Sequence, residues 1–463
     1  MNLSGPEKIL NLLRSIVLFL FLMVLAVPAE AAIAPAWGNP VEQQAIRLDE
    51  AISYAIKHNP GIRNAGRDVE IEQYEIDTAQ ANRFPRIDLG GGVVRYRYDT
   101  PLTPLVITPP ISATTEFPVV RRTIWDNGIS FRLPLFRGGR LYRSVTVAEM
   151  RKAIAQDNYK LTIQDLIYNL TSVYYKISQL EKLLNANEQS VNQLKSHRKN
   201  AELLFQAGSV PKVDLLKTDV ELAHAEENRI IVKNNLVSTY EVLKALMGMD
   251  AMDTEIRIAT EEPARKPYPE LEESLTKALL QRPDFTAVKR KRLISEERVK
   301  IAQGKWFPEI SASGEYVAKA GSETSFKENW NYGVRFTMPL FDGGLIRAEV
   351  NKEKANLEKV KEEERSLRIA IAKDVRNAHL GIANALERMD VTEKAIESAR
   401  ESLRVETLKY DTGAGTNTDV IDAQTAMLRA ETDYYQAVFD REIALAYLKK
   451  TIGGDEYRPE AER

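Results

Sequence analysis

The chain has 463 residues and a formal net charge of −2, from 64 basic and 66 acidic residues. This balance argues against a nucleic-acid binder, whose affinity depends on excess positive charge. Charged residues make up 28% and hydrophobic residues 44%, which argues against a disordered chain and a polytopic helical membrane protein. Cysteine is absent, which excludes disulfides and cysteine-bound metals. The four histidines form no metal-ligand spacing, so the sequence predicts no metal site and no cofactor.

The N-terminus has the layout of a secretory signal peptide. Lys8 and Arg14 precede an apolar run over 16–27, and an Ala-x-Ala site follows at 29–31. We therefore expect residues 1–31 to be a cleaved signal and the mature chain to be exported. An uncleaved membrane anchor is the alternative, but the apolar core is shorter than the roughly 20 residues that a spanning helix needs.

The chain contains an internal duplication. The motif Pro-Leu-Phe-x-Gly-Gly begins at Pro134 and again at Pro339, an offset of 205 positions. Upstream, Asn59-Pro60 matches Arg282-Pro283 at an offset of 223, so the first copy carries 18 extra residues. They fall within the proline-rich stretch 99–123, which predicts a long loop, taken as extracellular. The two expected repeats are 32–250 and 251–463.

Each repeat has the same order of predicted elements: a short helix, two strands, a very long helix, a glycine-containing turn and a return helix. Residues 140–207 contain neither glycine nor proline, and 345–412 contain only Gly381. Each stretch therefore predicts a helix about 100 Å long. The other predicted helices are 61–83, 212–247, 284–303 and 416–452, and the predicted strands are 87–98, 124–136, 309–319 and 329–341.

The long helices carry the apolar seam of coiled-coil packing. Apolar residues at alternating spacings of four and three run from Tyr159 to Leu184, and again from Ile371 to Met389. The helices alone fit a soluble coiled-coil rod as well as any other assembly.

The predicted strands favour a membrane protein over such a rod. In the last strand Trp330, Tyr332 and Val334 alternate with polar residues, and the other strands show similar alternation. Period-two runs of about ten residues fit transmembrane β-strands, although a soluble sheet with one wet face is the alternative. Four strands cannot close a barrel, so several chains would have to share one. The residues expected in a membrane aromatic belt are Trp125, Trp330 and Tyr332.

These features together resemble the TolC-type outer-membrane efflux proteins (outer membrane factors). The resemblance rests on the export signal, the duplicated unit, the repeated Pro-Leu-Phe-x-Gly-Gly and the second turn, 410–423. It implies a mainly α fold with a membrane β-barrel portion: a homotrimer sharing a twelve-stranded β-barrel that continues into a periplasmic α-helical barrel. A mixed α/β belt would come from 33–60, 248–283 and the C-terminal tail.

The implied function is an outer-membrane exit duct of a tripartite efflux pump or type I secretion system, in a Gram-negative bacterium. The implied partners are outer-membrane lipid, a periplasmic adaptor (membrane fusion) protein and an inner-membrane pump of the RND, ABC or MFS type. The sequence specifies neither the pump class nor the cargo. A non-conducting trimeric envelope stalk or adhesin is the alternative function. No motif of a nucleophile elbow, a zinc protease or a supported acid pair is present, so an enzyme is not expected.

The resemblance also implies roles for individual residues. Asp419 and Asp422 match aspartates of the periplasmic entrance constriction, although helix N-terminal capping also explains acids there. Tyr410 matches a tyrosine that hydrogen-bonds across to the first turn, where its partner matches Asp214. The family has a basic residue at the position of Gly415. The helix-turn tips expected to dock the adaptor contain Gly208, Gly413 and Gly415. The strand-to-helix junctions contain Pro134, Gly138, Gly139, Pro339, Gly343 and Gly344.

Two runs of like charge fall outside these features. Residues 289–292 are basic and residues 362–364 are acidic. Both are expected to be solvated helix faces, with contact to another subunit or the adaptor as the alternative.

Overall fold

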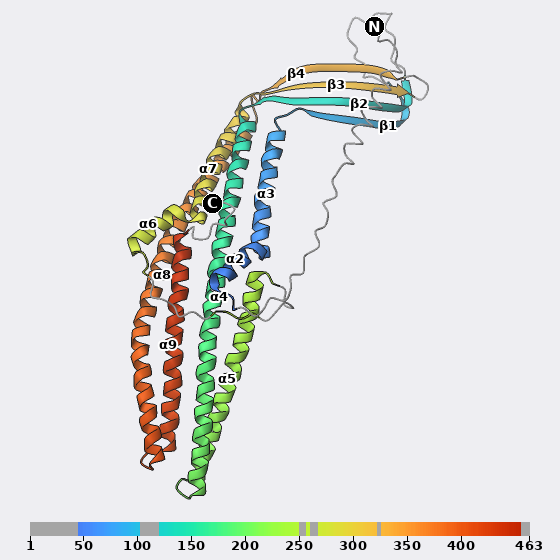
Figure 1. Cartoon of the computed structure of the whole chain (residues 1–463). Coiled ribbons are helices and arrows are strands. Elements are labelled where there is room, and N and C mark those ends of the chain that lie inside the picture. The colour runs from blue at the N-terminus through green and yellow to red at the C-terminus, as the bar shows by residue number, and fades with distance from the viewer. Residues whose placement is uncertain (1–44, 102–119, 250–255, 260–266, 322–325, 455–463) are drawn as a thin grey trace, which may run out of the picture. The chain divides into compact units, whose positions relative to one another are not determined.

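The computed structural model describes residues 45–101, 120–249, 256–259, 267–321 and 326–454, and its elements carry the labels of Figure 1. The expected signal peptide and most of the expected 99–123 loop lie outside these residues. The first repeat contains α2 (Leu48–His58), α3 (Pro60–Ala81), β1 (Arg86–Pro101), β2 (Val120–Arg137), α4 (Arg140–Gln206) and α5 (Lys212–Met247). The second contains α6 (Leu271–Gln281), α7 (Pro283–Gln303), a 3-10 turn (Gly304–Trp306), β3 (Glu309–Gly321), β4 (Lys327–Thr337), α8 (Leu345–Asp411) and α9 (Asn417–Ile452).

The two repeats correspond element by element. Helices α2 and α6 both have 11 residues, α4 and α8 both have 67, and α5 and α9 both have 36. Helix α3 begins at Pro60 and α7 at Pro283. Proline suits a first helical position because its fixed φ is helical and the N–H it lacks would have no partner there. The sequence duplication is therefore also a structural one.

All four strands differ by a few residues from their expected bounds, and β4 is the one that ends earlier than expected. Strand β4 ends at Thr337, whereas the sequence predicted a strand to residue 341. Pro339 follows, and proline cannot donate a hydrogen bond to a sheet. Strand β2 continues past the equivalent Pro134 because its register against β3 shifts between Pro134 and Phe136. The same motif thus ends one strand and only distorts the other.

The four strands form one antiparallel sheet in the order β1-β2-β3-β4 (Figure 1). Ser130 lies opposite Asp88 and Glu315, and its neighbour Ile129 lies opposite Leu89 and Tyr316. Because side chains alternate along a strand, the register sorts them onto two faces. The apolar face includes Ile87, Leu89, Trp125, Ile129, Tyr316, Trp330, Tyr332 and Val334. The polar face includes Arg86, Asp88, Asp126, Ser130, Arg132, Ser313, Glu315, Asn331 and Arg335.

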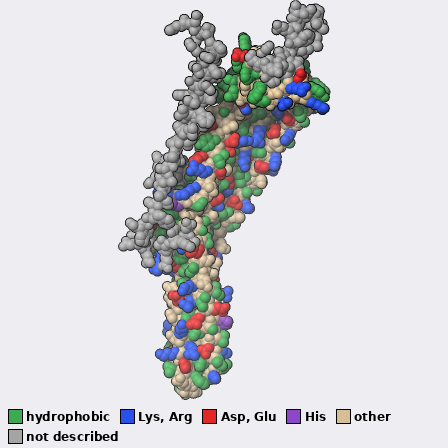
Figure 2. Space-filling model, turned by 90° about the vertical axis from the view of Figure 1, so that its right-hand side faces the viewer, with side chains coloured by type: hydrophobic (Ala, Val, Ile, Leu, Met, Phe, Trp, Pro, Cys, Tyr) green, Lys and Arg blue, Asp and Glu red, His purple; other side chains and the backbone are tan. Residues whose placement is uncertain are grey.

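The long helices α4 and α8 are each accompanied by shorter helices. Helix α4 runs beside α3 and α7 toward the sheet and beside α5 toward its other end, and α8 is flanked by α7 and then α9 (Figure 1). Two helical hairpins, α4–α5 and α8–α9, therefore end in turns that lie far from the strands. In Figure 2, hydrophobic side chains gather over the strands, whereas charges of both signs are interspersed along the helices.

The expected coiled-coil seam is confirmed as the core of both repeats. Its buried members are Ile163, Leu166, Leu170, Ile177 and Leu180 in α4, and Ile371, Val375, Ala378, Ile382, Ala385 and Met389 in α8. Helix α2 covers the first seam, where Ile52 joins the cluster around Leu170 and Met247. Phe285 and Ala278 cover the equivalent part of the second. Burial of each large aliphatic side chain contributes about 1.5–3 kcal/mol.

A short parallel bridge joins the start of the first repeat to the connection between repeats. The Ile46 amide donates to the Arg257 carbonyl (2.8 Å), and the Ala259 amide donates to the Ile46 carbonyl (3.0 Å). The Tyr174 hydroxyl of α4 donates to the Ala259 carbonyl at 2.6 Å and ties the bridge to the helices. The bridge falls within two of the segments expected to form a mixed α/β belt.

None of the helices in the described part of the chain combines the length and apolar character that a membrane-crossing helix requires.

Candidate functional site

The two hairpin tips form the strongest candidate site. Helix α4 ends at Gln206 and α5 begins at Lys212, while α8 ends at Asp411 and α9 begins at Asn417. Gly208 and Gly413 adopt the left-handed conformation that lets the chain leave a helix and reverse. The glycines predicted at the tips therefore lie in the turns. Several side chains then connect the first tip with the second.

Asp419 lies in the first turn of α9 and acts as a helix cap. Its carboxylate accepts from the Thr416 backbone N–H (3.2 Å) and the Thr416 hydroxyl (2.6 Å), and the Thr416 side chain in turn accepts from the Asp419 N–H. This reciprocal arrangement is a capping box. The hydrogen bonds from Thr416 lower the pKa of Asp419, with a smaller contribution from the charge of Lys409. Asp419 thus stays ionised at lower pH than an ordinary aspartate.

Asp422 lies one helical turn further along α9. It is exposed, as is Asp419, whereas the neighbouring Val420, Ile421 and Ala423 are buried. A spacing of three residues puts both carboxylates on the same solvent-facing side of the helix. The capping alternative therefore applies to Asp419, and Asp422 makes no capping contact among the described residues.

Tyr410 and Asp214 do not form the hydrogen bond that the resemblance implied. The Tyr410 side chain is only 3% exposed, and its hydroxyl has no hydrogen-bond partner among the described residues. Its ring instead packs against the ring of His197, with centroids 4.8 Å apart. Burial is the main cause that raises the pKa of Tyr410, and the charge of Asp214 adds to it. The two residues are neighbours, but a different residue connects the hairpins.

That residue is Asn417, the first residue of α9. Its Nδ2 donates to the backbone carbonyl of Asp214 (3.0 Å), and its Oδ1 lies 2.6 Å from His197 Nε2 and 3.1 Å from Thr218 Oγ1. A carbonyl can only accept, so Nδ2 must face Asp214, and His197 must carry its proton on Nε2. Asn417, Thr218 and His197 are 1%, 0% and 6% exposed. Burial lowers the pKa of His197, which favours its neutral form.

Sequence reasoning missed both His197 and Asn417. A signal was present, because His197 follows the buried Leu194 by three residues and precedes the buried Ala201 by four. A polar residue in phase with an apolar seam predicts a buried hydrogen-bond partner. Asn417 gave no comparable signal, since an asparagine beside a helix start is ordinary.

Gly415 has no room for a side chain in this conformation. A β-carbon there would lie 2.9 Å from Lys409 Cβ and 3.1 Å from the Tyr410 backbone nitrogen. The Gly415 amide also donates to the Lys409 carbonyl at 3.0 Å, which holds the turn against the end of α8. The basic residue that the resemblance implies for this position would therefore not fit the turn in this conformation.

Two more exposed contacts link the hairpins. Asn200 of α4 donates to the Asp411 carboxylate at 2.6 Å, and the Lys217 ammonium of α5 donates to the Thr418 hydroxyl at 3.3 Å. Lys217 is the residue of the first repeat that corresponds in position to Asp422 of the second. Solvent competes with such exposed contacts, so they contribute less than the buried Asn417 contacts.

The strand-to-helix junctions lie at the ends of β2 and β4. All four of their glycines, Gly138, Gly139, Gly343 and Gly344, have positive φ. In the second junction the Asp342 carboxylate accepts from the amides of Gly344 (2.9 Å) and Ile346 (2.8 Å), which caps α8. Arg137 occupies the equivalent position in the first junction and cannot accept such bonds. There the Arg140 guanidinium pairs with Glu309 and ties α4 to β3 instead.

The residues predicted for an aromatic belt share the apolar face of the sheet. Trp330 and Tyr332 stack with ring centroids 5.7 Å apart, and both are largely exposed. Trp125 lies opposite Val93 and Ala320 on the same face. Large exposed aromatic residues gathered on one sheet face are typical of a surface that contacts a membrane or another protein.

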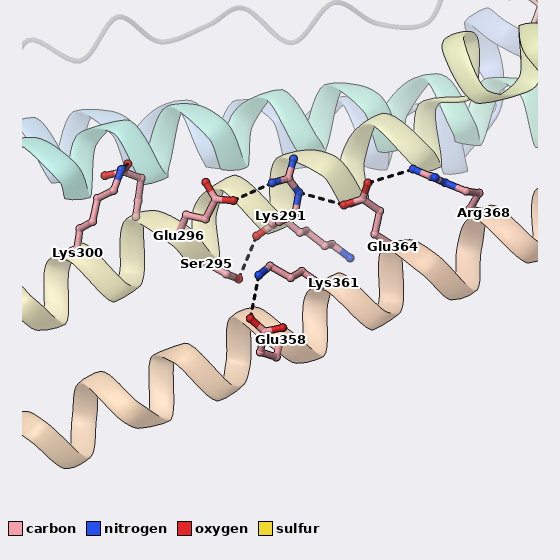
Figure 3. Close-up of polar contacts among 10 residues, drawn as sticks. Lys291, Ser295, Glu296, Lys300, Glu358, Lys361, Glu364 and Arg368 are labelled. Atoms are coloured by element: carbon pink, nitrogen blue, oxygen red, sulfur yellow. Dashed lines mark hydrogen bonds and ion pairs between the residues drawn. The ribbon is translucent and has the colours of Figure 1, made fainter.

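The two runs of like charge are only partly solvated. Arg290 pairs with the buried carboxylate of Asp157 on α4. Arg292 contacts Glu364 of α8 at 3.0 Å and Glu296 at 2.8 Å, and Figure 3 shows Glu364 directed toward Arg368 as well. The expectation of solvated faces is therefore wrong for Arg290, Arg292 and Glu364, because opposite charges meet where α7 packs against α4 and against α8. Lys291, Glu362 and Glu363 are exposed as expected.

No group of histidine, aspartate and glutamate side chains in the described residues has a geometry that could hold a metal ion.

Comparison with known proteins identifies what this architecture is similar to. A sequence model of the outer membrane efflux protein family matches residues 51–249 and 275–454. The chain is 21% identical over 430 residues to the outer membrane protein TolC of Salmonella enteritidis, covering 90% of this chain and 84% of that protein. It is 22% identical over 427 residues to the solvent efflux pump outer membrane protein SrpC of Pseudomonas putida, covering 88% and 85%.

The fold is also similar to a solved outer membrane channel. The crystal structure of CmeC from Campylobacter jejuni aligns with a TM-score of 0.76 at 18% sequence identity, covering 91% of this chain and 90% of that chain. A similarity at this level of identity concerns the fold alone, so the side-chain contacts at the tips are described for this chain only.

Proposed function

This chain belongs to the outer membrane efflux protein family, and we propose that three copies of it assemble into one passive duct. It is an outer membrane efflux protein, and the duct would conduct substrates from the periplasm to the exterior. Its work is conduction, gating and electrostatic selection, without bond chemistry. The observation that carries the proposal is the four-stranded sheet, which has one apolar face, one polar face and two outer strands without a further partner among the described strands.

The outer strands β1 and β4 could pair with those of further copies of the same chain. Within the chain β2 pairs with β3, which is the last strand of one repeat beside the first strand of the next. Strand β4 is the repeat of β2, and β1 is the repeat of β3. Pairing of β4 with β1 of a neighbouring copy therefore repeats a contact that the chain already makes. In lipid each backbone group left unpaired costs several kcal/mol, which favours a closed ring.

Three copies fit a duct better than two. Two copies would supply eight strands, and the interior of an eight-stranded barrel is filled by its own side chains. Three copies would supply twelve, which leaves room for a passage. The polar face with Arg132, Glu315 and Arg335 would then line the passage, and the apolar face with Trp125, Trp330 and Tyr332 would contact lipid.

At the other end, the helix tips would form the periplasmic entrance. Three copies would bring six carboxylates, from Asp419 and Asp422, around one axis. Such a ring attracts cations and repels anions. The exposure of both side chains on one helical side supports this role. Gating would consist of movement of the α8–α9 hairpin relative to the α4–α5 hairpin, with Tyr410 and Asp214 close to the contact between them.

The partners follow from membership in an efflux family. A relative named as the outer membrane protein of a solvent efflux pump supports pairing with an inner-membrane pump, of the RND, ABC or MFS type, and a periplasmic adaptor. The adaptor would contact the tip turns that contain Gly208, Gly413 and Gly415. These turns are exposed and lie at the ends of both hairpins (Figure 1).

Single-channel conductance of the purified protein in a planar bilayer tests the proposal. We expect discrete, cation-selective steps in salts of differing cation and anion size. A protein that inserts but never conducts, even after the tips are opened by the substitutions described below, would support a non-conducting stalk. A protein that fails to insert would contradict the membrane role of the four strands.

A further inference from the structure

We propose that Asn417 is the residue that holds the closed entrance shut in this chain, and that the hydroxyl of Tyr410 opposes closure. The inference rests on the proposed duct function, since it assigns the gate of that duct. It reverses the role that the resemblance implied for Tyr410, in which the tyrosine hydroxyl itself keeps the entrance closed.

Asn417 contacts both helices of the first hairpin. Its Oδ1 accepts from His197 on α4, and its Nδ2 donates to the Asp214 carbonyl on α5. The Thr218 hydroxyl of α5 shares its proton between Asn417 Oδ1 and the Asp214 carbonyl, at 3.1 and 2.9 Å. The Asn417 amide therefore uses both oxygen lone pairs and one of its two N–H groups.

The position of Asn417 makes these contacts a clasp between hairpins. It is the first residue of α9, directly after the turn from α8, so it moves with the second hairpin. Movement of α9 away from the first hairpin breaks all its side-chain bonds together. Each net hydrogen bond changes an equilibrium roughly 2- to 12-fold, and buried bonds lie toward the upper end. The exposed contacts of Asn200 and Lys217 add less.

Tyr410 acts in the opposite direction. Its ring is buried against His197, but its hydroxyl is enclosed without a hydrogen-bond partner among the described residues. When the hairpins separate, water reaches this hydroxyl and satisfies it. The unsatisfied hydroxyl therefore destabilises the closed state and not the open one. This penalty shifts the equilibrium between the two states roughly 5- to 150-fold toward the open state. A phenylalanine would keep the ring packing and remove that cost.

No other side chain of residues 412–419 makes a buried contact with the first hairpin, since the contact of Thr418 with Lys217 is exposed. At Gly415, where the resemblance implies a basic residue, a β-carbon would press on Lys409 and Tyr410. The Asp419 carboxylate is engaged with Thr416 inside its own turn. Asn417 is thus the one residue of turn 412–419 whose side chain is buried in the first hairpin, as its 1% exposure shows.

The test uses full-length trimers carrying Asn417→Ala, Tyr410→Phe, or both. Open probability in planar bilayers and hydrogen exchange of the peptide over 412–427 are measured for each. We expect Asn417→Ala to raise the open probability about tenfold or more and to speed exchange. Tyr410→Phe should slow exchange, and in the double variant it should reverse part of the opening caused by Asn417→Ala. Thr218→Val, which is nearly isosteric, should open the entrance less than Asn417→Ala.

Asn187→Ala is the matched control. Asn187 is also a buried asparagine of a long helix, but it donates only to the Leu183 carbonyl of its own helix. It should change neither readout at the tips. If Asn417→Ala and Thr218→Val leave exchange and open probability unchanged in intact trimers, the clasp is wrong. If Tyr410→Phe opens the entrance, the role of the hydroxyl is wrong.

The two readouts separate this inference from the proposed function. Hydrogen exchange reports the contact between hairpins whether or not ions pass. Exchange that changes as expected, in a protein that never conducts, would uphold the clasp and overturn the duct. Conduction with unchanged exchange in Asn417→Ala would uphold the duct and overturn the clasp.

Discussion

Gly138, at the end of β2, and Gly304, directly after α7, meet backbone against backbone. A β-carbon on Gly138 would overlap the Gly304 carbonyl, and one on Gly304 would lie 2.7 Å from the Gly138 carbonyl oxygen. Gly343, the repeat of Gly138, has a similar φ of +66° but no neighbouring atom within 4 Å of a β-carbon. The duplicated motif therefore has two different physical environments within one chain.

Gly138→Ala should prevent the chain from folding, whereas Gly343→Ala should permit a folded monomer. Alanine pays about 1–2 kcal/mol for a left-handed conformation at either site. Only at Gly138 does it also force two backbones apart. Refolding in detergent, followed by electrophoresis that separates unfolded chain, folded monomer and trimer, measures the difference. Equal loss of folded monomer in both variants would contradict this asymmetry. Loss of trimer alone in Gly343→Ala would mean that a neighbouring copy packs there.

The fold was predictable from the sequence because its signals are long and repeated. Helices α4 and α8 follow from glycine- and proline-free stretches with a continuous apolar seam, and their ends match the expected bounds within one residue. The end of β4 was less predictable, because a proline that ends one strand is accommodated in the other by a register shift at Pro134. That shift depends on β3, which is distant in the sequence.

The tip was only partly predictable. Asp419 and Asp422 are exposed residues whose spacing on one helix is visible in the sequence. The Asn417 contacts join residues about 200 positions apart, and no local pattern specifies them. Tyr410 shows the limit of analogy, since a matched residue lies at the expected place without the expected hydrogen bond.

Pairing between copies can be tested with introduced cysteines, because the chain has none of its own. Gly128 lies opposite Val317 in the β2–β3 pair. Gly333 of β4 corresponds to Gly128 at the repeat offset of 205, and Val94 of β1 corresponds to Val317 at the offset of 223. If β4 pairs with β1 of a neighbouring copy in the same register, Gly333 lies opposite Val94 of that copy. Gly333→Cys with Val94→Cys should therefore give an intermolecular disulfide and a covalent trimer. Within one chain β1 and β4 are three strand spacings apart, about 14 Å, which is too far for a disulfide.

Val93→Cys with Gly333→Cys is the control for register. Val93 is paired with Trp125 on the apolar face, whereas Gly333 shares the polar face with Ser313. Side chains on opposite faces cannot bridge. Equal cross-linking of the two pairs would contradict the transferred register, and no cross-linking of the Val94 pair would contradict closure through β4 and β1.

Neutralising the entrance acids should weaken cation preference. Asp419→Asn with Asp422→Asn removes six carboxylates from the proposed ring, so the cation-to-anion permeability ratio should fall toward the value set by the rest of the passage. Asp422→Asn alone should reduce the ratio without disturbing the helix start. Asp419→Ala should also loosen the first turn of α9, since it removes half of the capping box. Reversal potentials in asymmetric salt measure the ratio, and an unchanged ratio in the double variant would exclude the assigned role.

The capping bonds should also set the pH at which selectivity is lost. Hydrogen bonds from Thr416 lower the pKa of Asp419, so its charge remains below the usual aspartate range and disappears as pH falls through the lowered value. Thr416→Val removes the hydroxyl donor and should move this loss of selectivity to higher pH. Thr418→Val is the control, because Thr418 does not hydrogen-bond to Asp419. It should leave unchanged the pH at which cation selectivity is lost.

His197 should make the contact between the hairpins weaken in mild acid. Burial lowers the pKa of His197 below its ordinary value of about 6.5, although Asn417, Asp411 and Asp214 act in the other direction. The closed tip therefore binds a proton less readily than the separated or unfolded tip. Its stability is greatest above about pH 6.5 and falls as pH decreases through that value toward the lowered pKa. Hydrogen exchange over 412–427 should rise between pH 7 and pH 5, after correction for the chemical exchange rate.

His197→Gln should remove most of this pH dependence, because glutamine can still donate to Asn417 but does not titrate. His379→Gln is the matched control. Burial also lowers the pKa of His379, but this histidine contacts Ser274 of α6, far from the tips in Figure 1. Its replacement should leave the exchange of 412–427 as pH-dependent as before. If His197→Gln retains the full dependence, the acids of the tip control the contact, and neutral His197 is only a hydrogen-bond donor.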